Sequence, residues 1–207
     1  MRKERYMGDE SRVECMVSRF GDQLEDPILD LGCRDKILRH YFDQVVGIDN
    51  VKSPYIDFKY DLERVERGYQ LPEAKTVVAS HILEHLSNKD ELVDVIKDGE
   101  PKWVLIGLPN ELNWMRRMNF LRGQAHGKFT VWPGDRHKWF FTLESAKWWS
   151  VEKMAPQYDL FDECAPTFDL KEAQFYTNAL QFLVEFFGSE SMASRDWWGL
   201  FKRKEGF

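Results

Sequence analysis

The chain has 207 residues, of which 43% are hydrophobic and 14% aromatic, and its 29 Lys and Arg against 35 Asp and Glu give a formal net charge of −6. This length supports one substantial core, so we expect a single domain over residues 1–207. The acidic balance gives no reason to expect a polyanion as the default partner, although it leaves room for a local basic patch.

Cysteine usage and apolar stretches indicate the cellular setting. Cys15, Cys33 and Cys164 are far apart and lack C-x-x-C spacing, which argues against a disulfide framework and a structural zinc site. The N-terminus has no apolar leader segment, and the longest apolar stretch, residues 179–187, is interrupted by polar side chains and is too short to span a bilayer. We therefore expect a cytoplasmic protein with no membrane insertion.

The first expected element is an amphipathic helix within residues 1–25, where Val13, Met16, Val17 and Phe20 recur at helical spacing. After it, short apolar runs alternate with amphipathic stretches, a pattern typical of an α/β protein with a mostly parallel sheet. The runs expected to form strands are residues 28–31, 45–49, 56–60, 76–80, 103–107, 158–164 and 197–202. The stretches expected to form helices between them are residues 37–42, 83–96, 112–121 and 143–153.

One further apolar helical face lies within residues 166–195 and predicts a helical insertion that packs against the domain. The complete prediction is therefore an α/β fold. It consists of a Rossmann-like, seven-stranded, mostly parallel sheet with helices on both faces and an inserted helix before the last strand.

Polar residues close four consecutive strands of this expected sheet. They are Asp30 and Gly32, Asp49 and Asn50, Asp61, and finally Ser80 and His81. Ligands of doubly wound sheets bind at these carboxyl ends, where Asp49 can accept hydrogen bonds from ribose hydroxyls and Asp61 can reach the amine of an adenine. A strand-ending aspartate is also an ordinary helix cap or turn residue, but four in register favour a ligand-binding edge.

The loop after the first strand separates two classes of cofactor. A nicotinamide dinucleotide needs several glycines so that its pyrophosphate can approach a helix N-terminus, whereas only Gly32 stands here, before Cys33, Arg34, Asp35 and Lys36. A loop with one glycine and a carboxylate on either side suits a cationic ligand without phosphate. S-adenosylmethionine is such a ligand.

Residues 25–150 resemble the class I S-adenosylmethionine-dependent methyltransferases, in particular their small-molecule and glycan group. The motifs that carry the resemblance are Ile28-Leu-Asp-Leu-Gly-Cys33, Gly47-Ile-Asp-Asn50, Ser80-His-Ile-Leu-Glu-His-Leu86, Leu108-Pro-Asn110 followed by Asn113, and the segment from Asp135 to Leu143. The resemblance implies S-adenosylmethionine as cofactor. It assigns the methionine end to Asp30, Gly32 and Cys33, the ribose and adenine edge to Asp49 and Asn50, the adenine to Asp61 and Leu62, and the sulfonium neighbourhood to Ser80.

Methyl transfer from a sulfonium needs alignment and, for a hydroxyl or amine acceptor, removal of a proton. His81 follows the fourth strand directly and is the candidate general base. The alternative is a histidine that caps a helix or contacts the cofactor without proton transfer.

His81, Glu84 and His85 have the spacing i, i+3 and i+4, so on a helix they can share one face, and His137 can add a distal ligand for a divalent metal. This pattern partly resembles metal-dependent O-methyltransferases, including RNA 2′-hydroxyl methyltransferases with a Glu-x-x-Glu-His motif. In this chain His81 stands at the position of the first Glu of that motif. The sequence alone favours the alternative without a metal, in which Glu84 and His85 are ordinary polar residues of a helix.

Basic residues are concentrated after the fifth expected strand and indicate either solvated helix faces or a site for an anionic acceptor. They are Arg116, Arg117, Arg122, Lys128, Arg136, His137 and Lys138.

The first functional hypothesis is a methyltransferase for a small-molecule, lipid-linked or glycan acceptor held under a lid at residues 113–141. The second is a metal-dependent RNA 2′-O-methyltransferase. The third is a cofactor-binding protein without turnover, suggested by Arg34-Asp35-Lys36 where the family usually carries more glycine. The sequence does not indicate an oligomeric state.

Overall fold

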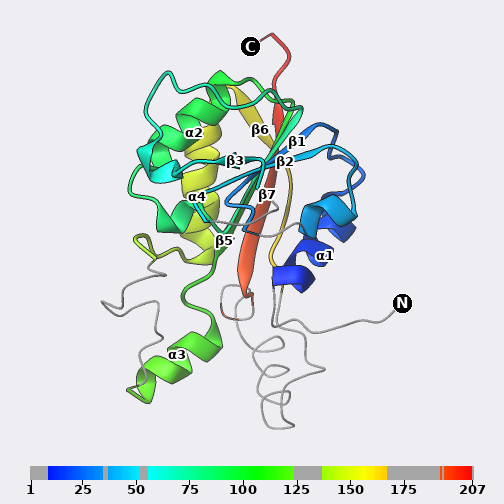
Figure 1. Ribbon diagram of the computed structural model, residues 1–207. Coiled ribbons are helices and arrows are strands. Elements are labelled where there is room, and N and C mark those ends of the chain that lie inside the picture. Colours follow the sequence, from blue (N-terminus) through cyan, green and yellow to red (C-terminus); the bar gives the residue numbers. More distant parts are fainter. Residues whose placement is uncertain are drawn as a thin grey trace.

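The computed structural model describes residues 9–34, 37–51, 56–123, 137–166, 192 and 194–206, and Figure 1 shows their arrangement. The strands are β1 (Ile28–Leu31), β2 (Val45–Asp49), β3 (Phe58–Lys59), β4 (Thr76–Ser80), β5 (Trp103–Pro109), β6 (Tyr158–Cys164) and β7 (Asp196–Arg203). They form one seven-stranded sheet in the order β3-β2-β1-β4-β5-β7-β6. Strands β1 to β5 pair in parallel, whereas β7 runs antiparallel to β5 and β6. The predicted mostly parallel seven-stranded sheet is confirmed.

Helical segments cover both faces of the sheet (Figure 1). The helical segments are α1 (Asp9–Phe20), η1 (Ile37–His40), η2 (Leu62–Arg64), η3 (Leu83–His85), α2 (Lys89–Asp98), α3 (Trp114–Leu121) and α4 (Leu143–Met154), of which α3 extends away from the sheet (Figure 1). Successive strand residues point to opposite faces, so Val78 joins the buried cluster of Met16 and Phe20 from α1, while Val77 joins the cluster of Leu92 from α2. The prediction of helices on both faces is confirmed, as is the N-terminal amphipathic helix.

The single helix predicted over residues 83–96 is wrong, because η3 and α2 are separate elements. The side-chain amide of Asn88, between them, donates to the carbonyl oxygens of Leu62 and Val65 at 3.0 and 2.8 Å. These bonds tie the linker to the chain after β3 and replace the continuing helical turn. As a result, Glu84 and His85 lie on a short 3-10 turn at the end of β4 rather than on a long helix face.

Three shorter elements also differ from the prediction. Strand β3 has only two residues, and the helix expected over residues 37–42 is the 3-10 turn η1. Helix α3 begins at Trp114 rather than at residue 112, because the side-chain oxygen of Asn113 accepts the backbone N–H of Arg116 at 3.1 Å and caps the helix.

The helical insertion expected over residues 166–195 falls almost wholly outside the described residues. Within the described part of the chain, no helix is long and apolar enough to cross a membrane. The single domain and the cytoplasmic location stay predictions.

Candidate functional site

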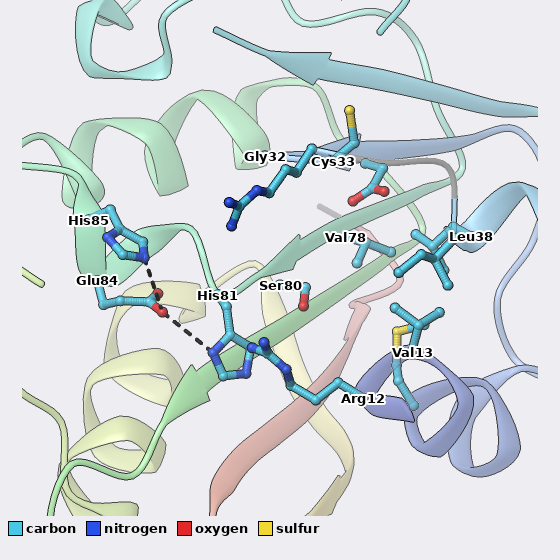
Figure 2. Close-up of a pocket in the computed structure, with 14 residues that line it drawn as sticks. Arg12, Val13, Gly32, Cys33, Leu38, Val78, Ser80, His81, Glu84 and His85 are labelled. Carbon is cyan, nitrogen blue, oxygen red and sulfur yellow. Dashed lines mark ion pairs between the residues drawn. The ribbon is translucent and has the colours of Figure 1, made fainter. Parts of the chain in front are cut away.

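A cavity lies at the carboxyl ends of β1 and β4, where the strand order changes direction (Figure 2). Seven residues that the sequence singled out line it: Asp30, Gly32, Cys33, Ser80, His81, Glu84 and His85. Helix α1 contributes Arg12, Val13 and Met16 to the opposite wall. The cavity therefore joins the predicted site for the methionine end of the cofactor to the candidate catalytic residues.

Gly32 shapes the wall formed by the loop after β1. Its φ is +73°, and a Cβ at this position would lie 2.9 Å from side-chain atoms of Ile82. Its backbone N–H donates to the carbonyl of Ile48 at 2.8 Å, which fixes the turn against β2. Both the backbone conformation and the close approach require glycine here.

Cys33 is a neutral thiol in this wall. Burial, together with the nearby charges of Asp30 and Asp49, raises the pKa of its thiol to about 12. A thiol with this pKa is not a nucleophile at neutral pH. Cys33 is therefore suited to contacting a cationic ligand, and not to covalent catalysis.

The residues predicted at the ribose and the adenine do not line this cavity. The carboxylate of Asp49 accepts the backbone N–H groups of Arg34 at 2.8 Å and Val51 at 3.1 Å, so it joins the loops after β1 and β2. Asp61 caps η2, and Leu62 is buried in the core. Asn50, the next residue after Asp49, is exposed. Cofactor contact by these four residues stays a prediction.

His81 is the residue that turns the chain from β4 toward η3. Its φ is +52°, an uncommon conformation for a residue with a side chain, and its backbone N–H donates to the carbonyl of Gly107 at 3.0 Å. The ring lies between two buried carboxylates, with Nδ1 3.5 Å from Glu84 and Nε2 3.6 Å from Asp196. Backbone strain of this kind is concentrated at functional sites, so His81 is well placed for a chemical role.

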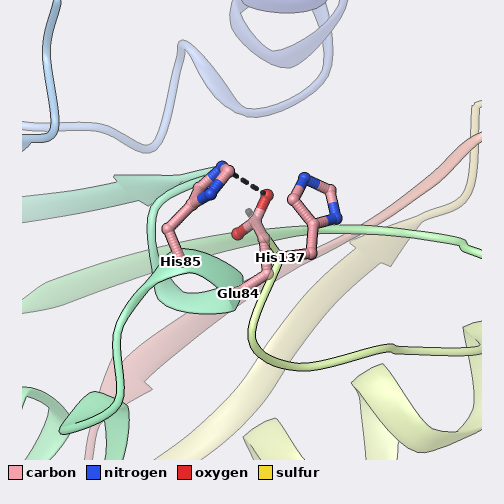
Figure 3. Close-up of side chains that lie close together, drawn as sticks. All are labelled: Glu84, His85 and His137. Atoms are coloured by element: carbon pink, nitrogen blue, oxygen red, sulfur yellow. Dashed lines mark ion pairs between the residues drawn. The ribbon is translucent and has the colours of Figure 1, made fainter. Parts of the chain in front are cut away.

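Three of the four candidate metal ligands come together (Figure 3). One ligand atom from each of Glu84, His85 and His137 lies within 4.8 Å of the other two. The Glu84 carboxylate is fully buried, and the rings of His85 and His137 meet edge to face with centroids 4.6 Å apart. His81 is not part of this trio but contacts it through Glu84.

Comparison with known proteins shows which solved structures share this architecture. No protein-family model matches the chain, and no curated protein matches it. Among solved structures, a SAM-dependent methyltransferase from Archaeoglobus fulgidus matches 95% of this chain and 96% of its own, at 18% identity and TM-score 0.56. The small RNA methyltransferase HEN1 matches 100% of this chain and 27% of its own, at 14% identity and TM-score 0.61. The N-methyltransferase NodS from Bradyrhizobium japonicum, in complex with S-adenosyl-l-homocysteine, matches 97% of this chain and 90% of its own, at 9% identity and TM-score 0.52.

The chain has the class I methyltransferase fold. At these identities the likeness shows the fold alone, and the site must be judged from its own residues. In this methyltransferase fold, the edge of the sheet that carries the cavity also carries the Glu84, His85 and His137 trio.

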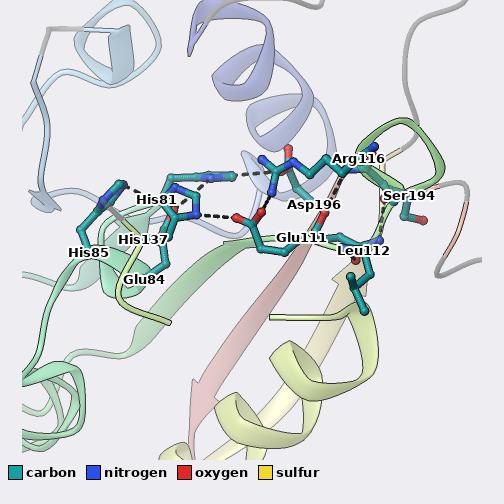
Figure 4. Close-up of polar contacts among 11 residues, drawn as sticks. His81, Glu84, His85, Glu111, Leu112, Arg116, His137, Ser194 and Asp196 are labelled. Carbon is teal, nitrogen blue, oxygen red and sulfur yellow. Dashed lines mark hydrogen bonds and ion pairs between the residues drawn. The ribbon is translucent and has the colours of Figure 1, made fainter. Parts of the chain in front are cut away.

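A second group of buried charges lies behind the trio (Figure 4). Glu111, two residues after the end of β5, pairs with Nδ1 of His137 on one side and with the guanidinium of Arg116 from α3 on the other. Burial lowers the pKa of Arg116 from its ordinary value. Arg116 is thus paired with a buried carboxylate rather than placed on a solvated helix face, and a site for an anionic acceptor among the basic residues stays a prediction.

The segment that carries His137 is fastened to η3. The backbone N–H of Lys138 donates to the carbonyl of Glu84 at 2.8 Å, and the indole N–H of Trp139 donates to that of Leu86 at 2.7 Å. The ammonium of Lys89 lies 4.1 Å from the centre of the Trp139 ring. These contacts explain how a histidine more than fifty residues from Glu84 in sequence reaches the same site.

Sequence analysis missed three contributors to the site. Arg12 lies on a helix that was expected only from its apolar face, and Asp196 begins the last strand. Glu111 follows the Pro109-Asn110 pair that the family resemblance singled out, and this proximity is the one signal that could have found it. None of the three belongs to a spacing pattern.

Proposed function

We propose that the chain is an S-adenosylmethionine-dependent methyltransferase. The observation that carries this proposal is the cavity at the switch point of the sheet, lined by Asp30, Gly32 and Ser80. The residues fit the cofactor, because Gly32 lets the backbone approach closely, the carboxylate of Asp30 suits an ammonium group, and Cys33 adds no competing charge. The cofactor supplies a methyl group already activated by its sulfonium. The chain's own contribution is then to hold and align the two reactants.

For the acceptor we propose a hydroxyl, deprotonated with the help of a divalent cation held by Glu84, His85 and His137. One carboxylate and two imidazoles form a donor set that suits Mn²⁺, Fe²⁺, Co²⁺ or Zn²⁺. Such an ion supplies Lewis acidity, which makes a nearby hydroxyl easier to deprotonate. The trio shares Glu84 and His85 with the cavity, so the ligand set adjoins the place proposed for the cofactor.

Within this class we propose the ribose 2′-hydroxyl of RNA as the acceptor. Two observations support it over the small-molecule and glycan acceptors that the sequence favoured. The trio brings together three of the four ligands that the RNA hypothesis names, and the solved structures with this fold include a small RNA methyltransferase.

The second candidate is a methyltransferase that needs no metal and acts on a small-molecule, lipid-linked or glycan acceptor. It is favoured by the position of His81, which lines the cavity and is held between Glu84 and Asp196. In this version His81 accepts the proton of the acceptor group.

Calorimetry tests the common part of both candidates. We expect S-adenosylmethionine and S-adenosylhomocysteine each to bind at one site per chain, and binding of neither would refute both candidates. Methyl transfer is then measured on an RNA oligonucleotide and on DNA of the same sequence, which lacks the 2′-hydroxyl. Transfer to RNA alone that a chelator abolishes and Mn²⁺ restores supports the first candidate.

Transfer to small hydroxyl compounds that a chelator does not affect supports the second candidate instead. Cofactor binding without transfer to any acceptor of the panel would favour a cofactor-binding protein without turnover.

A further inference from the structure

We propose that Glu111 is a positioning residue for the metal site: held by Arg116 of α3, it fixes the ring of His137 through Nδ1, so that Nε2 is the nitrogen offered to a cation shared with Glu84 and His85. This inference rests on the proposed metal site and adds a residue that no motif of the chain indicates.

The backbone around Glu111 is held on two sides. Its own N–H donates to the carbonyl of Phe141 at 2.7 Å, which joins the end of β5 to the segment that carries His137. The side-chain amide of the preceding residue, Asn110, donates to the carbonyl of Ser194 at 2.8 Å. The Glu111 side chain therefore starts from a fixed point between α3 and His137, and it is 1% exposed.

The contact with His137 sets the state of the ring. An ionised carboxylate only accepts hydrogen bonds, so the Nδ1 atom of His137 that faces Glu111 must carry the proton. In a neutral imidazole the proton on one nitrogen leaves a lone pair on the other, here Nε2. A carboxylate behind a histidine ligand fixes its tautomer and orientation in many metal sites.

Arg116 makes the arrangement stable. A buried carboxylate without a positive partner is strongly unfavourable, and His137 is neutral when it serves as a ligand. The guanidinium of Arg116 supplies the missing charge, since it pairs with the second oxygen of Glu111 (Figure 4). Three segments, from β5, α3 and residues 137–141, thus meet at one carboxylate.

The test uses two substitutions of Glu111 and measures the protein without cofactor or acceptor. Glu111→Ala removes the contact, whereas Glu111→Gln keeps an oxygen that can accept the Nδ1 proton. Glu25→Gln is the control, because Glu25, like Glu111, is a carboxylate paired with a basic and an aromatic side chain, here Lys102 and Trp103, but lies at the opposite, amino edge of β4. Mn²⁺ binding is followed by the electron paramagnetic resonance signal of the free ion, and folding by circular dichroism.

We expect Glu111→Ala to weaken Mn²⁺ binding by about 10- to 100-fold, the usual effect of losing the partner behind a metal ligand. Glu111→Gln should recover part of this loss, and Glu25→Gln should bind like the wild type. Nitrogen-15 spectra of the metal-free wild type should show His137 protonated at Nδ1, and this preference should weaken in Glu111→Gln. The spectra keep the inference testable if Glu111→Ala does not fold.

Wild-type Mn²⁺ affinity in both Glu111 variants, or a His137 ring protonated at Nε2 in the wild type, would overturn the inference while leaving the metal site intact. A wild-type protein that binds no Mn²⁺ would overturn the metal site and this inference together, while cofactor binding would still stand as a separate result.

Discussion

Two groups of residues at the cavity are built by different physical means. The backbone wall consists of Gly32, Cys33 and Arg34, which line the cavity, and of Asp49, which lies outside it and accepts backbone N–H groups; it depends on a left-handed glycine and on that carboxylate. The charge wall consists of His81 and Glu84, which line the cavity, and of Glu111, Arg116 and His137 behind them; these ionisable side chains contact one another with little exposure to water.

This difference predicts how a substitution in each wall affects its neighbours. A change in the backbone wall removes one contact and leaves its neighbours able to bind water. A substitution in the charge wall leaves a buried charge without its oppositely charged partner. The free-energy cost then also affects the residues that contact this charge. The predictions below separate the two behaviours.

The largest effect is expected in the charge wall, at His81. If His81 is the general base, His81→Ala lowers turnover by about 10² to 10⁴ and leaves S-adenosylhomocysteine affinity nearly unchanged. Turnover is measured per folded molecule on the best acceptor found, with His40→Ala, at an exposed histidine of η1, as control.

Two other outcomes at His81 are informative. Partial recovery of His81→Ala by added divalent ion would assign His81 to the metal site rather than to proton transfer. Unchanged turnover with a lower melting temperature would leave it a structural role only.

In the backbone wall, Asp49→Ala is expected to weaken S-adenosylhomocysteine binding by about 1.5 to 3 kcal/mol, the usual cost of losing a hydrogen bond to a charged group. Calorimetry measures the affinity, and Asp94→Ala, which removes a paired carboxylate on α2, is the control. An unchanged dissociation constant in folded Asp49→Ala would remove this residue from the cofactor site and leave it only its contacts with Arg34 and Val51.

Gly32→Ala tests the conformation of the same wall. The positive φ costs about 1 to 3 kcal/mol of stability for a residue with a side chain, and the added Cβ presses on Ile82. Gly68→Ala is the matched control, because Gly68 has φ +87° but open space around its Cβ. Thermal unfolding should show a loss in both variants, whereas only Gly32→Ala should weaken cofactor binding. Equal affinities in the two variants would show that the close approach at Gly32 is unimportant for the ligand.

The smallest effect concerns Asp90, which lies on α2 and belongs to neither wall. Burial raises the pKa of Asp90, but hydrogen bonds from Lys153, Lys89 and Trp149 outweigh it, so the pKa is lower than usual. Ionised Asp90 therefore stabilises the folded state above the pKa of about 4 that an aspartate has in the unfolded chain. This stabilisation is lost as the pH falls through the lower pKa of Asp90 in the folded state. It amounts to about 0.5 kcal/mol or less, because the side chain is 42% exposed. Unfolding of Asp90→Asn should depend less on pH below 4 than that of the wild type, and an identical pH profile would contradict the assignment.

The backbone wall could largely be predicted from sequence, whereas the charge wall could be predicted only in part: the sequence indicated His81, Glu84 and His137 but not the pairing of His137 with Glu111 and Arg116. Gly32 follows β1 directly and Asp49 is the last residue of β2, and the topology of a parallel sheet brings such residues to one edge. Glu111 and His137 pair although they are 26 residues apart, and no periodic pattern in the sequence predicts this contact. The break before α2 was equally hidden, because it depends on bonds from Asn88 to carbonyls of another loop.

Helix α1 has a consequence for the dynamics of the chain. It lines the cavity with Arg12 and Val13 and buries Met16 and Phe20 against the sheet, so a ligand in the cavity touches an element that precedes the whole Rossmann-like unit. Filling the cavity should then hold α1 more firmly in place, and its amide hydrogens should exchange with deuterium more slowly in the presence of S-adenosylhomocysteine. Because this signal arises in a segment without catalytic residues, it would report occupancy of the cavity even while the methyl acceptor is unknown.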